Sequence, residues 1–160
     1  MTAARRARTV APPRRIDVAV ESEVSQRLVS RTRARDIVRR ALRHAGVDRA
    51  MVSVTFVSRR EIARLNREHL HKKGPTDVIT FAFTPVARGT PLVADVYIAP
   101  DVARENARTW GVGQREELVR VLVHGALHAA GLDHPERDRT HSAMWRRQES
   151  LVQRAGRGKK

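Results

Sequence analysis

Several segments of the chain alternate between apolar and polar residues, which is the two-residue period of a β-strand with one buried face. In MVSVTFVS, for example, Val52, Val54 and Phe56 fall on one side, and the other side carries Met51, Ser53, Thr55 and Val57. Strands of this kind are separated by turn-rich connections such as VARGTPL. We expect four strands, at residues 15–20, 51–58, 76–83 and 93–99.

Other segments repeat their apolar residues with the 3.6-residue period of a helix. In TRARDIVRRALRHAG a stripe containing Ile37 and Ala41 faces away from the arginines, and Gly46 ends the pattern. In the next such segment Ser58 caps the helix start, with Glu61 at the capping-box position. We expect five helices, at residues 32–46, 59–70, 100–111, 114–131 and 141–155.

The order of these elements, β-α-β-α-β-β-α-α-α, predicts an α/β (α+β) fold with one mixed, mostly four-stranded sheet and about five helices packed on it. The helix at 114–131 is apolar nearly all round between Leu118 and Ala130, so it should be the buried central helix. A chain of 160 residues suits a single core. We place this domain at residues 15–155, between a disordered basic extension (1–14) and a basic tail (156–160).

Three of the seven histidines lie within the motif HGALHAAGLDH of the central helix and its exit. His124 and His128 are four residues apart, so they point the same way on the helix. Gly131 ends the helix and turns the chain back, which allows His134 to meet the other two. Three converging imidazoles are the protein ligands of a catalytic zinc site with its fourth position open to water. The sequence thus predicts one metal ion per chain, for which Zn²⁺ is best suited although nickel and copper also accept imidazole. The domain is expected to be a metal-dependent hydrolase.

The same spacing occurs in zinc peptidases, but those enzymes carry a glutamate directly after the first histidine as their general base. Gly125 occupies that position here, so the peptidase interpretation lacks its base. The other four histidines have no such neighbours and are interpreted as surface or loop residues: His44, His69, His71 and His141.

The formal net charge is +15, which favours a polyanionic partner because basic side chains release counterions from phosphates. With three Phe, two Trp and one Tyr, a broad base-stacking platform is not expected. The absence of cysteine excludes disulfides and thiolate metal sites. No apolar run has the roughly 18 residues needed to span a membrane. We read no secretory signal, and a cytoplasmic location is therefore expected.

The histidine motif resembles the signature HG-x-LH-x-x-G-x-DH of the YbeY family of bacterial rRNA-maturation endoribonucleases, and every fixed position matches. Upstream, LNREHLHKKGPTDVITF resembles the family's second block, and ADVYIAP resembles a third with Ala94 in place of the usual glycine. The blocks follow the family order across roughly residues 50–135. The resemblance implies a zinc-dependent cut in single-stranded RNA, with 16S rRNA 3′-end maturation and ribosome quality control as the setting. The implied partners are single-stranded rRNA and the small ribosomal subunit, with the protein expected to be a monomer.

One position departs from the resemblance. Many family members carry an arginine, thought to serve the phosphate chemistry, where Leu70 stands in this chain. The neighbouring cations His69, His71, Lys72 and Lys73 replace its charge only if the loop brings one of them to the metal.

Hydrolysis of a phosphodiester by metal-bound water requires charge neutralisation and proton transfer as well as the metal. Asp133 is the nearest carboxylate in sequence and has three possible roles: orienting a ligand histidine, acting as the base, or bonding the turn backbone. The alternative to an enzyme is a non-catalytic rRNA- or ribosome-binding assembly factor with a structural zinc. The candidate RNA-binding cations are Lys72, Lys73, Arg104, Arg115 and Arg120.

Overall fold

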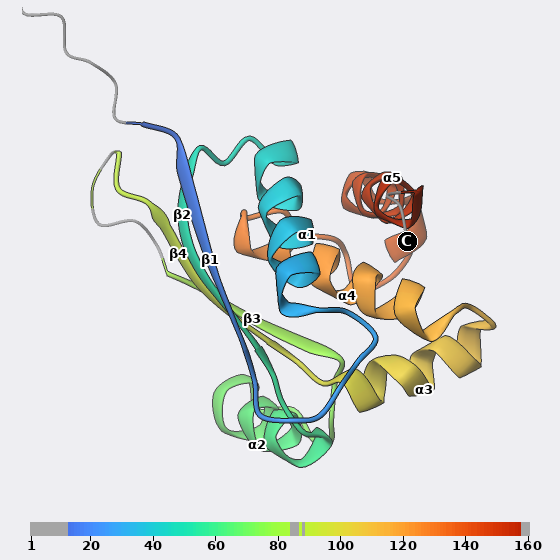
Figure 1. Ribbon diagram of the computed structural model, residues 1–160. Coiled ribbons are helices and arrows are strands. Elements are labelled where there is room, and N and C mark those ends of the chain that lie inside the picture. Colours follow the sequence, from blue (N-terminus) through green and yellow to red (C-terminus); the bar gives the residue numbers. More distant parts are fainter. Residues whose placement is uncertain (1–12, 84–86, 88, 158–160) are drawn as a thin grey trace, which may run out of the picture.

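The computed structural model describes residues 13–83, 87 and 89–157. It confirms one mixed four-stranded sheet with helices packed on it (Figure 1). The strands are β1 (Arg15–Ser22), β2 (Arg49–Phe56), β3 (Val78–Phe83) and β4 (Leu92–Ile98). The helices are α1 (Arg31–His44), α2 (Arg59–Leu70), α3 (Pro100–Trp110), α4 (Gln114–Ala129) and α5 (Ala143–Arg157), with a 3-10 turn η1 at Arg139–His141.

The strand order is β1-β2-β4-β3. β1 pairs in parallel with β2, and β2 pairs in parallel with β4, while β3 runs antiparallel at the edge beside β4. The parallel pairs are joined by crossovers that contain a helix, as parallel strands require. β1 is two residues longer than its sequence pattern indicated, because its register continues until Ser22 pairs with Phe56.

Successive side chains of each strand point to opposite faces of the sheet, and each face contacts different helices. Val18, Val52 and Val96 are buried with the main core against α1 and α4 (Figure 1). The opposite face is covered at one end by α2, whose Ile62 packs in a smaller cluster with Ile79 of β3. The sheet therefore has a fully covered face, on which the central helix lies, and a partly exposed one.

The central helix α4 is buried as predicted. It packs between the sheet on one side and α1, α3 and α5 on the others. Leu118, Leu122 and Leu127 are each completely buried.

The structure describes the flanking segments only in part. Residues 1–12 of the predicted N-terminal extension and 158–160 of the predicted tail lie outside the described residues. Gly156 and Arg157, assigned from sequence to the tail, form the last residues of α5. Among the described residues, no helix is long and apolar enough to cross a membrane.

Candidate metal centre

The three motif histidines converge in the structure. His124 and His128 project from one side of α4, and their ring centroids are 4.6 Å apart. The ring of His134 lies 5.2 Å from that of His124 and 5.1 Å from that of His128. One nitrogen from each ring lies within 4.8 Å of the others, which is compatible with a shared metal ion.

The turn after α4 brings His134 back to the helix. Gly131 has a φ of +87°, a conformation that residues with a Cβ rarely adopt. Its N–H donates to the carbonyl of His128 over 2.9 Å, and the N–H of Leu132 donates to Leu127 over 3.0 Å. These two bonds form a Schellman motif, which reverses the chain direction at the helix end.

Two of the imidazoles are oriented by oxygen acceptors. Nδ1 of His124 lies 2.7 Å from Oε1 of Gln148 on α5, and Nδ1 of His134 lies 3.1 Å from the carbonyl of Pro135. Because both partners are oxygen acceptors, each Nδ1 carries the proton and each Nε2 keeps its lone pair. Nε2 of His134 is buried and has no hydrogen-bond partner. A bound metal ion is the partner that satisfies such an atom.

Gln148 belongs to a hydrogen-bonded chain that joins α4 to α5. Its side chain is buried, and its Nε2 donates to Glu149 over 3.2 Å. Glu149 in turn accepts from Nε of Arg120 over 2.8 Å. Arg120 and His124 are four residues apart on α4, so both reach α5 from the same side of the helix.

The surroundings favour neutral imidazoles, the form that binds metal. Burial lowers the pKa of His124, against the opposing effect of its hydrogen bond to Gln148. Burial, together with the charges of His124 and His134, lowers the pKa of His128 to about 4. Both rings are therefore uncharged at neutral pH.

Gly125 is explained by packing against the sheet. A Cβ placed on it would lie 2.7 Å from Cγ1 of Val96 and 3.1 Å from Cγ2 of Val78. The hydroxyl of Thr80 donates to the Gly125 carbonyl over 3.3 Å. The position that carries glutamate in the zinc peptidases therefore points into a close helix–sheet contact and has no room for a side chain.

The remaining motif residue, Asp133, is exposed and bonds the turn. Its Oδ1 accepts from the backbone N–H of His134 over 2.8 Å. Of the three roles considered from sequence, this contact corresponds to bonding the turn backbone. It also fixes the peptide unit that presents the His134 ring.

The candidate RNA-binding cations differ in their surroundings. Arg120 is 15% exposed and pairs with Glu116, Glu117 and Glu149, at 2.6–2.8 Å. Its guanidinium is already engaged by three carboxylates, so Arg120 is less available to phosphate than the sequence alone indicated. Arg104 pairs with Asp101 on the same helix over 2.9 Å. The exposed candidates without a salt bridge in the described part of the chain are Lys72, Lys73 and Arg115.

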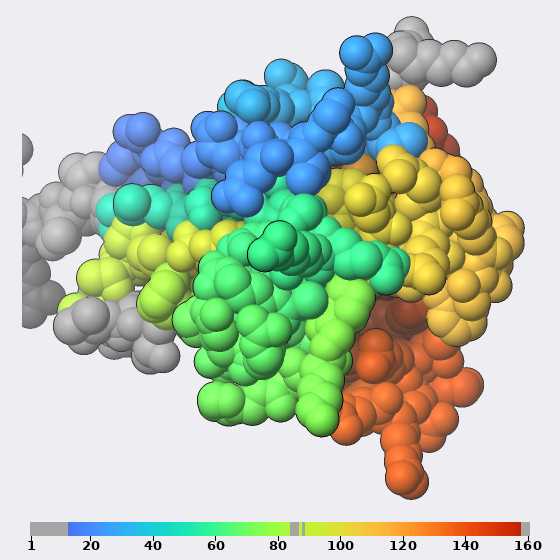
Figure 2. All heavy atoms as spheres, turned by 90° about the horizontal axis from the view of Figure 1, so that it is seen from below, coloured from blue at the N-terminus to red at the C-terminus, as the bar shows by residue number. Residues whose placement is uncertain are grey.

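The residue in place of the family arginine is the last one of α2. Leu70 is 42% exposed. The ring of His69 packs edge-on against Phe81 at 5.3 Å and is not among the clustered histidines. His71 follows as the helix cap with a φ of 53°. Figure 2 shows a hollow between the green residues of α2 with its following loop and the orange residues after α4.

The two strand-associated aspartates lie apart. Asp95 accepts a hydrogen bond from Ser53, and it alternates with the residues that face α4. Asp77, just before β3, accepts from Asn106 over 3.1 Å, and its charge acts on His124. Asp77 is thus the strand-associated acid whose charge reaches the histidine cluster.

Sequence reasoning missed two residues near the centre. Gln148 has a weak signal in the sequence, a polar residue on the buried side of the amphipathic last helix. Arg139 of η1 has none, yet its charge contributes to lowering the pKa of His124. Both come from the segment after the motif, and their approach depends on how α5 packs on α4.

The fold and the centre define an α/β protein with a candidate three-histidine metal site on a buried helix. A sequence model of the family described as Endoribonuclease YbeY matches residues 18–156. The chain therefore belongs to the YbeY endoribonuclease family, and it is a hydrolase that cuts RNA. This assignment favours the endoribonuclease interpretation over the peptidase one.

Individual relatives agree with the family match. Endoribonuclease YbeY of Persephonella marina is 28% identical over 141 residues, covering 85% of this chain and 90% of that protein. Endoribonuclease YbeY of Bacillus licheniformis is 36% identical over 118 residues, covering 68% and 74%. The solution structure of TM1509 from Thermotoga maritima matches with a TM-score of 0.57 and 26% identity, covering 86% and 88%.

Proposed function

We propose that the chain is a zinc-dependent, single-strand-specific endoribonuclease that holds one Zn²⁺ through His124, His128 and His134. The observation that carries this proposal is the orientation of the imidazoles. Nδ1 of His124 and of His134 face oxygen acceptors, and the buried Nε2 of His134 has no partner within the described structure. Three neutral nitrogen donors suit Zn²⁺ best among the common divalent ions.

The donor set leaves a coordination position open. Among the described residues, the cluster contains three histidines and no carboxylate or fourth histidine. A structural zinc site has four protein ligands, whereas a catalytic site has three. When bound, the ion supplies an acidified water and polarises a phosphoryl oxygen.

The chain's own residues position the ligands of this centre. Gln148 fixes the ring of His124, and the Pro135 carbonyl fixes that of His134. Gly125 lets α4 lie close against Val78 and Val96 of the sheet. Asp133 orders the turn that presents His134.

We further propose that the substrate is single-stranded rRNA at the 3′ end of 16S rRNA, cut in the cytoplasm during small-subunit maturation and ribosome quality control. The sequence motifs of the family and the net charge of +15 support this substrate. Lys72 and Lys73 are exposed residues of the loop that follows α2 and are the proposed phosphate contacts. The protein is proposed to act as a monomer.

A cleavage assay tests the proposal. A single-stranded RNA with a 16S 3′-end sequence is incubated with protein of measured zinc content, alongside a chelator-treated sample and the His128→Ala variant. We expect cutting by the zinc-loaded protein, loss of cutting in both controls, and recovery when zinc is returned to the chelated wild type. Full activity of His128→Ala without bound metal would refute the assignment of the ligands.

Leu70 favours a second candidate, in which the protein holds zinc but assists ribosome assembly by binding. In that case the zinc-loaded protein leaves free RNA uncut and associates with immature small subunits. The Leu70→Arg variant separates the two: restored cutting would show that the missing cation alone had silenced the centre.

A further inference from the structure

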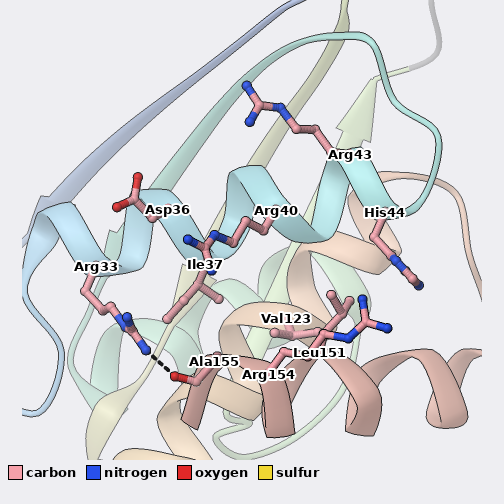
Figure 3. Close-up of a pocket in the computed structure, with 10 residues that line it drawn as sticks. All are labelled: Arg33, Asp36, Ile37, Arg40, Arg43, His44, Val123, Leu151, Arg154 and Ala155. Carbon is pink, nitrogen blue, oxygen red and sulfur yellow. Dashed lines mark hydrogen bonds between the residues drawn. The ribbon is translucent and has the colours of Figure 1, made fainter. Parts of the chain in front are cut away.

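A second, strongly basic site lies between α1 and α5. The two helices border a groove with a volume of about 440 Å³ (Figure 3). Ile37 of α1, Val123 of α4 and Leu151 of α5 line it with apolar groups. Its other lining residues include four arginines, Arg33, Arg40, Arg43 and Arg154.

The arginines of the groove are not neutralised by the protein. Within the described residues, none of the four has a carboxylate in salt-bridge range. Asp36 is the one acid in the lining. Its Oδ1 lies 3.7 Å from a guanidinium nitrogen of Arg39, a residue that does not line the groove.

One of these guanidiniums closes an end of the groove. Arg33 donates to the carbonyl of Ala155 near the end of α5, and its Nε is buried without a partner. Arg154 extends from α5 along the groove in the direction of His44. Positive charge near the C-terminal end of a helix is stabilised by the helix dipole. Arg40 precedes the last turn of α1, so this effect does not account for it.

The groove is separate from the metal centre. Val123 lines the groove while the next residue, His124, belongs to the histidine cluster, so the two sites lie on different sides of α4. On α5, Gln148 contacts the cluster and Arg154 lines the groove. Gln148 and Arg154 are six residues apart, which corresponds to roughly 9 Å along the axis of α5.

We propose that this groove is an RNA-binding exosite that holds the phosphate backbone of the substrate away from the point of cleavage. Guanidinium groups bind phosphate oxygens in bidentate fashion, and the apolar lining accommodates the less polar face of a nucleotide. The volume falls within the range of small-ligand sites. The groove has no aromatic side chain other than His44 for base stacking, so binding there should depend on charge and not on sequence. The proposal rests on the RNA-cutting activity, but not on which metal serves it or which rRNA is cut.

The test compares RNAs that reach one site or both. Binding of labelled single-stranded RNAs of about 4 and about 16 nucleotides, the limits of site size in single-strand-binding folds, is measured as a function of salt. The test variant is Arg40→Gln/Arg154→Gln, in which both residues are exposed. The control is Arg60→Gln, an exposed arginine of α2 on the other face of the sheet, with no salt bridge among the described residues.

We expect the double variant to bind the long RNA on the order of tenfold more weakly. Its log–log salt slope should fall by about 1.4, or about 0.7 for each phosphate of a single strand that the variant no longer neutralises. Its KM for the long RNA should rise in parallel at unchanged kcat, while its binding of the short RNA stays at the wild-type level.

Three outcomes would overturn the proposal: an unchanged salt slope with the long RNA, an equal loss with both lengths, or an equal loss in Arg60→Gln. An unchanged slope would leave a protein partner as the occupant to be sought. Because binding is read without cleavage, a protein that binds as expected but does not cut would count against the proposed function alone.

Discussion

Replacing Gln148 with methionine tests whether the structure has identified the residue that orients His124. Methionine matches glutamine in length and suits a buried site, so little packing is lost. The substitution removes the acceptor 2.7 Å from Nδ1 of His124 and the donor 3.2 Å from Glu149. The ring of His124 is then free to change tautomer and to rotate, and its Nε2 is no longer held toward the cluster.

Loss of such a supporting hydrogen bond weakens metal binding by about 10- to 100-fold, or about 1.4–2.8 kcal/mol. Removing the two hydrogen bonds also lowers the free energy of unfolding of the metal-free protein, by about 1 kcal/mol each. Zinc affinity is measured by competition with a chromophoric chelator, and unfolding by urea titration of chelated protein.

Gln153→Met provides the matched control, since Gln153 is an exposed residue of the same helix. It should leave both quantities unchanged. Gln148→Glu keeps an oxygen facing Nδ1 and should retain the zinc affinity. Wild-type affinity in Gln148→Met would refute the reasoning, since it would mean that the His124–Gln148 contact does not prepare the ligand.

Three further predictions concern other contacts of the fold. Gly125→Ala should destabilise the protein by about 1–3 kcal/mol through the clash with Val96, while Gly156→Ala, with open space around it, should gain about 0.5 kcal/mol; equal unfolding midpoints would contradict the close packing of α4. Arg120→Met should cost about 3 kcal/mol because it leaves the buried carboxylate of Glu117 and the partly buried carboxylate of Glu149 without their partner. Adding Glu149→Gln should recover part of that loss in the same urea assay, and no recovery would mean that the pairing is not the cause. The metal-free protein should lose stability as pH falls from 6.5 to about 4, because burial lowers the pKa of His128 to about 4, so that the unfolded chain takes up the proton first. His124, whose pKa is also lowered by burial, adds to this slope, so a slope in His128→Gln as steep as in the wild type would rule out the contribution of His128.

Local pattern was enough to predict the elements and the histidine cluster. The spacing of His124 and His128 on one helix, with Gly131 behind them, depends on backbone geometry within a few residues. The four strands and five helices were likewise recognisable from their periods. The strand order and the antiparallel direction of β3 were not, because they are decided by pairing between distant segments.

The partners of side chains were the least predictable part of the site. Arg120 looked available for phosphate in the sequence, but Glu116 and Glu117 of the preceding turn pair with it. Its third partner, Glu149, is 29 residues away and could not have been predicted. Gln148 likewise meets His124 only after α5 packs on α4. From the sequence, Gly125 indicated only that the peptidase base is absent. The reason for a glycine there is its close contact with Val78 and Val96, which lie on two separate strands.

All three proposed nitrogen ligands come from one short stretch, and His124 with His128 can meet on a single turn of helix before the sheet exists. An unfolded chain therefore retains part of the affinity for the ion. By mass action, a ligand stabilises the native state only by the difference between its binding to the folded and to the unfolded chain. The rise in Tm on adding zinc should thus be smaller than the native affinity alone implies. The size of this rise will report what folding adds to the site, namely the approach of His134 and the hydrogen bond between His124 and Gln148.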